Sequence, residues 1–234
     1  MLEITAIKPQ KKEGRFNIYL DGKFAFGIDE ETLVREKLEV GRKVTSSYIH
    51  KLVYGATVEK LADKALRFLS YRPRSEKEIR DHLWRKIKSP KGKGRALKSP
   101  GLGSKMSSEP SPKSLALGNS GSLIDDVIDK LKDLGYIDDT AFASWWLEQR
   151  IRFKPRGKML LRSELLAKGI DRDLVEEELS KYSAEEELSW AKRVVEKKIP
   201  QYKNLDPKER REKLSSYLAR RGFSWEVIEQ ALVD

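Results

Sequence analysis

The segment that decides the fold is FASWWLEQRIRFKPRGKMLLRSELLAK, residues 142–168. Before its Pro-Arg-Gly turn, Phe142, Trp145 and Trp146 recur at helical spacing, and after the turn Leu161 and Leu165 do the same. Proline lacks an amide proton and ends a helix, and apolar stripes on both sides of a sharp turn are typical of two packed helices. The segment therefore predicts a helix-turn-helix pair whose exposed corner is rich in basic residues.

Helical patterns of the same kind continue on both sides. From residue 57 onward the apolar residues keep helical spacing, and Ser75 with Glu78 and Ser183 with Glu186 fit the S-x-x-E capping signature. Residues 165–175 line up with residues 218–228 as a helix end, a glycine turn, a cap and a new helix. We predict nine helices in three tandem units of three. Because such units bury their faces poorly alone, we expect them to stack into an elongated array.

The N-terminal residues follow a different pattern. Residues 3–28 alternate like strands, with Ile4 and Ala6 on one face, and Asp21-Gly22 favours a tight hairpin turn. So few short strands need a packing partner, for which we expect helices at 30–37 and 46–53. These features predict a small α+β module that ends near residue 55.

Residues 88–122 have no periodicity and are dominated by glycine, serine and proline. They predict a disordered basic loop inserted between two helices. The predicted organisation is thus an α+β module over residues 1–55 and a first repeat over 56–137 that carries the insertion 88–122. A second repeat follows over 138–182 and a third over 183–234.

Composition narrows the classes of function. The net charge of +11 suggests a polyanionic partner, but residues 88–122 carry +6 of it, so the rest of the chain indicates such a partner less strongly than the total does. The chain has no cysteine and two histidines, which argues against a disulfide framework and a zinc site. We find no signal peptide, no apolar run of the roughly 20 residues that cross a bilayer, and no nucleophile with a plausible base. We expect a cytoplasmic, monomeric, non-enzymatic protein that needs no metal or cofactor.

Clustered cations at the predicted turns are the candidate binding residues. Arginine suits phosphate and carboxylate because its planar fork makes bidentate hydrogen bonds. On charge alone, a solvated basic face is the favoured interpretation of these residues. Their recurrence at successive turns favours binding. The candidates are Arg72, Arg74, Arg80, Arg150, Arg152, Lys154, Arg156, Lys158, Arg162, Lys168, Arg220 and Arg221.

Several other residues have two interpretations. Trp145 and Trp146 suit stacking on unpaired bases, but we favour core packing for at least one of them. We expect Trp190 and Trp225 to seal the junctions between repeats. Asp138-Asp139 resembles a metal pair but better fits helix capping. His82 lies on a charged predicted helix, so we expect its imidazole to be solvated.

The predicted last helix of the second repeat, residues 172–181, tests whether the repeats read DNA bases. Residues 171–187 hold eight acids and two basic residues. A helix with this charge is repelled by a phosphate-lined major groove. It suits a basic protein surface, or solvent.

Three stretches together resemble the RecX family of bacterial RecA modulators. They are YRPRSEKEIRDHL (residues 71–83), GYIDDTAFA (135–143) and the run from Arg150 to Ile170. The resemblance covers roughly residues 58–234, and the insertion 88–122 departs from the family pattern. It implies tandem three-helix repeats that dock in the groove of the RecA–DNA filament and modulate strand exchange and RecA-stimulated cleavage. The N-terminal strand module occurs in longer members.

We therefore expect a regulator of recombination and DNA repair. It binds RecA or the RecA–ssDNA filament and inhibits RecA ATPase, strand exchange and coprotease activity. The basic corners and the 88–122 loop could also contact DNA directly. The alternative is a helix-turn-helix DNA-binding regulator that acts without RecA.

Overall fold

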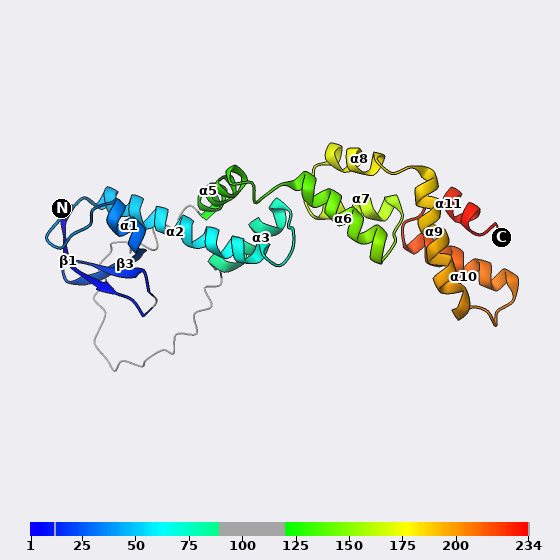
Figure 1. Ribbon diagram of the computed structural model, residues 1–234, viewed down its shortest axis with the longest axis horizontal. Coiled ribbons are helices and arrows are strands. Elements are labelled where there is room, and N and C mark those ends of the chain that lie inside the picture. Colours follow the sequence, from blue (N-terminus) through cyan, green and yellow to red (C-terminus); the bar gives the residue numbers. More distant parts are fainter. Residues whose placement is uncertain (12, 89–119, 234) are drawn as a thin grey trace. The chain divides into compact units, whose positions relative to one another are not determined.

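A computed structural model describes residues 1–11, 13–88 and 120–233. The chain forms two compact units (Figure 1). The first contains residues 1–70 and 80–136, and the second contains residues 71–79 and 137–234. None of the helices described in these ranges is long and apolar enough to cross a membrane.

The first unit begins with a four-stranded antiparallel sheet of order β3-β2-β1-β4. Its strands are β1 (Leu2–Pro9), β2 (Arg15–Leu20), β3 (Lys23–Asp29) and β4 (Lys43–Val44), the last of which the sequence pattern did not predict. The predicted hairpin turn is confirmed, since Asp21 and Gly22 have φ values of 46° and 79°, as a type I′ turn requires. A bulge between Ile4 and Ala6 shifts the alternation of β1. As a result Ile7, instead of Ala6, packs against the core.

Two helices cover this sheet, α1 (Glu30–Arg35) and α2 (Ser46–Leu69). The predicted break between residues 53 and 57 is wrong, because α2 is one helix of 24 residues that contains Gly55. Its first half buries Ile49, Leu52 and Val53 in the strand core, and its second half buries Leu61 and Ala65. A mid-helix glycine costs only about 1 kcal/mol, which burial at both ends outweighs.

Helices α3 (Glu76–Lys88) and α5 (Ser120–Asp133) complete the predicted first repeat. Tyr54 of α2 donates to Asp126 of α5 at 2.6 Å. The predicted loop lies mostly outside the described residues, although Lys88 and residues 120–122, at its two ends, are helical. The expectation that His82 is solvated is wrong, because its ring stacks on Phe68 with 4.1 Å between centroids and 8° between planes.

The second unit contains six helices among its described residues. The second repeat is α6 (Asp139–Phe153), α7 (Lys158–Ala167) and α8 (Arg172–Ser180). The third repeat is α9 (Ala184–Lys198), which runs into a 3₁₀ turn η1 (Ile199–Gln201), then α10 (Pro207–Arg220) and α11 (Trp225–Ala231). The predicted capping box is present in full, since Ser183 and Glu186 exchange side chain–backbone hydrogen bonds. The caps by Asp138, Asp206 and Ser224 also form.

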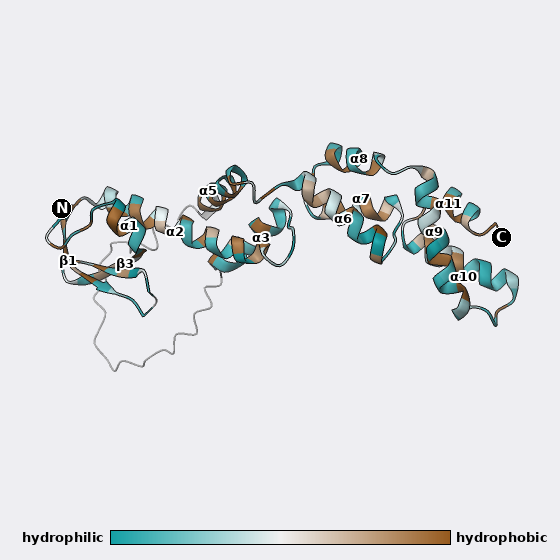
Figure 2. Cartoon of the chain, viewed as in Figure 1, coloured by the Kyte–Doolittle hydropathy of each residue, from teal (hydrophilic) through white to brown (hydrophobic). Residues whose placement is uncertain are grey.

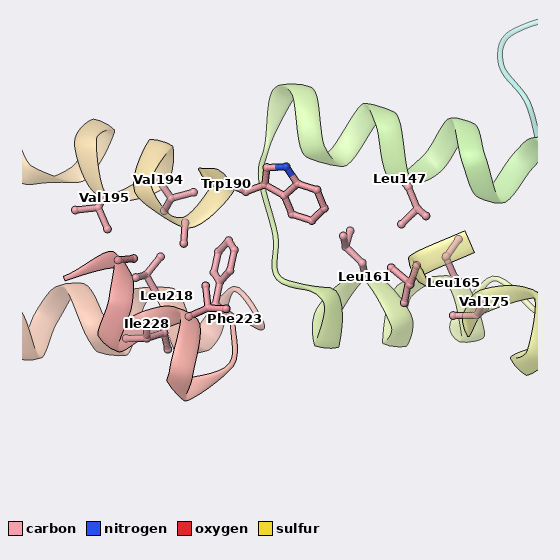
Figure 3. Packing of buried hydrophobic residues seen from close by; sticks show 14 of the residues in the cluster. Leu147, Leu161, Leu165, Val175, Trp190, Val194, Val195, Leu218, Phe223 and Ile228 are labelled. Atoms are coloured by element: carbon pink, nitrogen blue, oxygen red, sulfur yellow. The ribbon is translucent and has the colours of Figure 1, made fainter. Parts of the chain in front are cut away.

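Both repeats contribute to one apolar core (Figure 3). Hydrophobic and hydrophilic residues alternate around these helices (Figure 2), as a one-sided core requires. The buried residues Leu161, Leu165, Ile170 and Val175 recur 53 positions later as Leu214, Leu218, Phe223 and Ile228. The predicted three-helix architecture is thereby confirmed for the second and third repeats. The residue limits assigned to the domains stay a prediction.

Successive junctions in the second unit reuse one device. The second helix of a repeat has its first amide capped by an acid from the following repeat: Asp139 accepts from Glu76 N at 2.8 Å, and Glu187 accepts from Lys158 N at 2.9 Å. In each case the residue just before that second helix also donates a hydrogen bond to a turn later in the chain. Ser75 Oγ donates to the carbonyl of Lys168 at 2.7 Å, and Gly157 N donates to that of Arg221 at 2.9 Å.

Candidate interaction site

Two equivalent corners of the second unit carry four of the candidate cations and lie beside most of the others. Residues 71–75, Tyr-Arg-Pro-Arg-Ser, precede α3, and residues 153–157, Phe-Lys-Pro-Arg-Gly, precede α7. In both, an exposed aromatic ring is followed by a cation, a helix-breaking proline and an arginine. The local sequence thus turns the chain sharply and places arginines at the start of each second helix.

At the first corner Arg72 is held by Glu78. The guanidinium donates two hydrogen bonds to the carboxylate, at 2.9 and 3.0 Å, and Lys168 forms an ion pair with the same group. Burial raises the pKa of Glu78, but the hydrogen bonds from Arg72 and Lys168 outweigh it, so the pKa lies below its ordinary value. The carboxylate is therefore charged at neutral pH, and it neutralises part of the corner.

Trp146 joins this group to a second one centred on Glu164. Its indole Nε1 donates to Glu164 at 2.9 Å, as does Arg150 Nε, and Arg156 forms an ion pair with the same carboxylate. The ring also contacts cations, with Arg150 Cζ 4.2 Å and Lys168 Nζ 4.9 Å from its centroid. We call this set the tryptophan cluster: Trp146 with Arg72, Glu78, Arg150, Arg156, Glu164 and Lys168.

The cluster holds four cations against two carboxylates and is partly shielded from water. Burial lowers the pKa of Arg150 and of Arg156, and the nearby charges of Arg72 and Arg150, respectively, lower them further. Arg74, half-buried beside this group, has its pKa lowered first by burial and then by Arg72, while Glu78 opposes the shift. The excess positive charge is thus concentrated but largely internal.

Other candidate cations are open to solvent near the second corner. Arg152, Lys154 and Arg220 are exposed, and Arg152 lies over the ring of Phe153 at 5.2 Å. Two cations of the third repeat reach the same turn, where Arg193 donates to the carbonyl of Ile151 at 3.1 Å and Arg221 to that of Pro155 at 3.0 Å. We call the set Arg152, Lys154, Arg156, Arg193, Arg220 and Arg221 the basic corner.

Besides Arg74, which lies beside the tryptophan cluster, three predicted residues belong to neither group. Arg80 belongs to the first unit and pairs with Asp125. Lys158 directs its ammonium group to the carbonyl of Tyr182. Arg162 pairs with Glu176 at the surface, and that hydrogen bond raises the pKa of the arginine. Their side chains are engaged within the fold.

The acids and tryptophans also differ from expectation in part. Trp145 and Trp146 are both half-buried against the core. Of the two residues expected to seal junctions, Trp190 is buried, but Trp225 is 65% exposed, so that part of the prediction is wrong. Asp138 and Asp139 both cap helices.

The acidic stretch 171–187 is less accessible than its composition suggests. Glu178 and Glu187 are buried, and Glu178 accepts from Ser144 Oγ at 2.7 Å. Sequence reasoning missed Glu78, Glu164 and Glu187 as partners of the cations and caps. Of these three acids, only Glu78 could have been recognised from the sequence, because it follows the Ser75 cap by three positions.

Comparisons with known proteins agree on one family. The model described as Regulatory protein RecX N-terminal domain matches residues 2–45. The models for the first, second and third three-helix domains of RecX match residues 63–89, 138–179 and 185–232.

Similar proteins carry the same name. Regulatory protein RecX of Bacillus subtilis (strain 168) is 36% identical over 230 residues, covering 98% of this chain and 75% of that protein. The protein of the same name from Listeria welshimeri is 30% identical over 234 residues, covering 100% of this chain and 76% of that protein. A crystal structure of regulatory protein RecX matches with a TM-score of 0.68 and 25% identity over all of both chains. For RecX from Lactobacillus salivarius the TM-score is 0.55 at 22% identity over 75% of this chain and 94% of that one, a likeness of fold alone.

Proposed function

Because the chain belongs to the RecX family, we propose that it regulates recombination and DNA repair by binding RecA. The bound form is RecA itself or the filament that RecA forms on single-stranded DNA. Binding inhibits RecA ATPase, strand exchange and coprotease activity, and the protein performs no covalent chemistry. RecA enters as the partner that the family resemblance implies.

The observation that supports the proposal is the basic corner. Three elements, the end of α6, α9 and the end of α10, bring six cations to one turn, and Arg152, Lys154 and Arg220 among them are exposed. Exposed guanidinium groups in fixed geometry suit phosphate oxygens and protein carboxylates, which a nucleoprotein filament offers together. A repeat protein that binds there occupies the surface on which a second DNA strand or a substrate would lie.

The exposed acids of α8 favour this partner over bare duplex. Asp173, Glu176 and Glu177 are exposed on the helix that would have to enter a major groove. Phosphates repel such a helix, whereas a basic protein surface attracts it. This argues against the helix-turn-helix regulator that reads bases without RecA.

The test reverses three of the four exposed cations together, as Arg152→Glu, Lys154→Glu and Arg220→Glu, and leaves Arg193, which donates to the carbonyl of Ile151. We expect the concentration that half-inhibits RecA ATPase on single-stranded DNA to rise at least about tenfold, because like charges then face the filament. Arg150 and Arg156 are left intact, since removing them would strand the shielded carboxylate of Glu164.

The matched control changes net charge equally, as Lys23→Glu, Lys43→Glu and Lys51→Glu, three exposed residues of the first unit. We expect it to inhibit like the unmodified chain, with both variants keeping their helical circular dichroism. A corner variant that inhibits at the original concentration would remove the basic corner from the interface. Sequence-dependent binding to bare duplex that RecA filaments do not compete for would favour the alternative.

A further inference from the structure

A groove on the third repeat plays no part in the proposed function. It has a volume of about 710 Å³ and lies between α9, the start of α10 and the residues that follow α11. Its floor is apolar and includes Val195, Leu214 and Leu232. The rim carries the cations Lys192, Arg210 and Arg211 and one acid, Glu196.

The same surface exists on the second repeat, where it is filled. Leu214 and Leu232 correspond to Leu161 and Leu179 at the repeat offset of 53. In the first helices the offset is 48, which relates the buried Ala143 to Ala191 and makes Leu147 the counterpart of Val195. All of these residues of the second repeat are buried in the shared core.

What fills the site on the second repeat is the beginning of the third. The buried ring of Trp190 belongs to the same core as Leu147 and Leu161 (Figure 3). Three residues earlier, Glu187 caps the first amide of α7, and the ammonium group of Lys158 binds the carbonyl of Tyr182. The incoming helix therefore presents an acid and, three positions later, a large aromatic ring.

The junction before it uses the same spacing. Asp139 caps the first amide of α3, and Phe142, three positions later, is buried in the core. At both junctions the incoming helix carries an acid and, three positions later, an aromatic residue. This spacing places both groups on one helix face.

On the third repeat the acid would meet side chains instead of a free amide. Helix α10 starts one turn earlier than α7, with Pro207 first and with Asp206 accepting from Lys208 N and Glu209 N. Arg211 stands at the position of Lys158, and its present pair with Glu229, at 3.0 Å, is exposed and thus weak. Arg210 Nε is buried, with no hydrogen-bond acceptor among the described residues.

We propose that this groove binds a helix of a partner protein that carries an acidic residue and, three positions later, a large aromatic residue. The aromatic ring fills the apolar floor, and the carboxylate meets the arginines of the rim. The 88–122 segment of this chain is not the occupant by composition, since it contains no aromatic residue.

The probe is a labelled peptide of residues 182–199 of this chain, which carries Glu187, Trp190 and its own Ser183 cap. Fluorescence anisotropy against the full chain should show saturable binding. In the peptide, Trp190→Ala should weaken binding at least about tenfold, because buried aromatic anchors dominate such contacts. In the protein, Ile199→Asp at the groove edge and Arg211→Glu on its rim should each weaken it several-fold, roughly three- to tenfold.

Lys51→Glu, in the first unit, is the control and should leave peptide affinity unchanged. If Ile199→Asp perturbs folding, Val233→Asp replaces it, because Val233 lines the groove and is 67% exposed. Absence of saturable binding, or binding that both groove variants leave intact, overturns the proposal. So does concentration-dependent self-association that the groove variants abolish, since it would assign the groove to a second copy. RecA is absent from this experiment, so its result is independent of the proposed function.

Discussion

Glu164 collects donors from three side chains of α6 and the turn that follows it. Trp146, Arg150 and Arg156 all contact its carboxylate, which is 13% exposed. Two arginines this close repel each other unless an anion lies between them. The carboxylate is therefore what allows the basic sequence around the α6–α7 turn to fold compactly.

Removing that charge should be costly. We expect Glu164→Gln to lower the free energy of unfolding by about 2–4 kcal/mol, because it leaves two shielded guanidinium groups without a counter-charge. Urea unfolding followed by circular dichroism measures the change.

Glu176→Gln is the matched comparison. It breaks an arginine–glutamate pair of the same chemistry whose carboxylate side chain is 45% exposed, so the loss of stability should be much smaller than for Glu164→Gln. Equal, small losses for the two variants would show that the tryptophan cluster adds little to stability.

The sequence identified the cations of this cluster but not their division into paired and exposed groups. Arg150 reaches an acid 14 positions away, and Lys168 reaches Glu78 across 90 positions. Such partners follow from how the repeats pack, which no local pattern encodes. Arg152 and Arg156 cannot be told apart by local sequence, yet Arg152 is exposed to solvent and Arg156 binds Glu164.

Elements were easier to predict where local chemistry defines their ends. Gly135, Gly169 and Gly222 all have positive φ, and the caps at Asp138, Ser183, Asp206 and Ser224 all form. The break predicted near residue 55 is wrong because the local pattern around Gly55, a residue found both in turns and inside helices, does not separate two short helices from one long helix. Only its tertiary surroundings decide between them.

At Gly157 the backbone before α7 lies close to the backbone of the turn between α10 and α11. A Cβ there would lie 2.1 Å from the carbonyl oxygen of Gly222, so a side chain must push the α10–α11 turn away. We expect Gly157→Ala to destabilise the second unit by about 2–4 kcal/mol, measured by thermal or urea unfolding.

For Gly55→Ala, the same substitution at another glycine, we expect stability to rise instead of fall. Nothing lies within 4 Å of a Cβ at that position in α2, so alanine should stabilise the helix by about 0.5–1 kcal/mol. A neutral Gly157→Ala variant would mean that the two turns separate without cost.

For the whole molecule, charge is distributed very unevenly along the chain. Residues 88–122 carry +6 of the net +11. Within the compact units many cations pair with nearby acids, as Arg80 does with Asp125 and Arg162 with Glu176. A polyanion would therefore sense the insertion and the basic corner more strongly than the rest of the surface.

Replacing the six Lys and Arg residues between 89 and 119 by Gln preserves length and removes that contribution. We expect weaker binding to RecA filaments on single-stranded DNA at low salt, and a shallower decrease of affinity with rising salt, because fewer counterions are released. A salt series of filament pull-downs measures both. An unchanged slope would mean that the insertion makes no contact with the polyanion.

Helix α2 has one more consequence, for how this chain can vary. This one continuous helix packs on the strand core with its first turns and contacts α5 further along, where Glu59 accepts from Lys130 at 2.5 Å. Adding or deleting a single residue in between would rotate one face against the other by about 100°. The angle between these two contacts therefore lets α2 accept substitutions but not insertions or deletions.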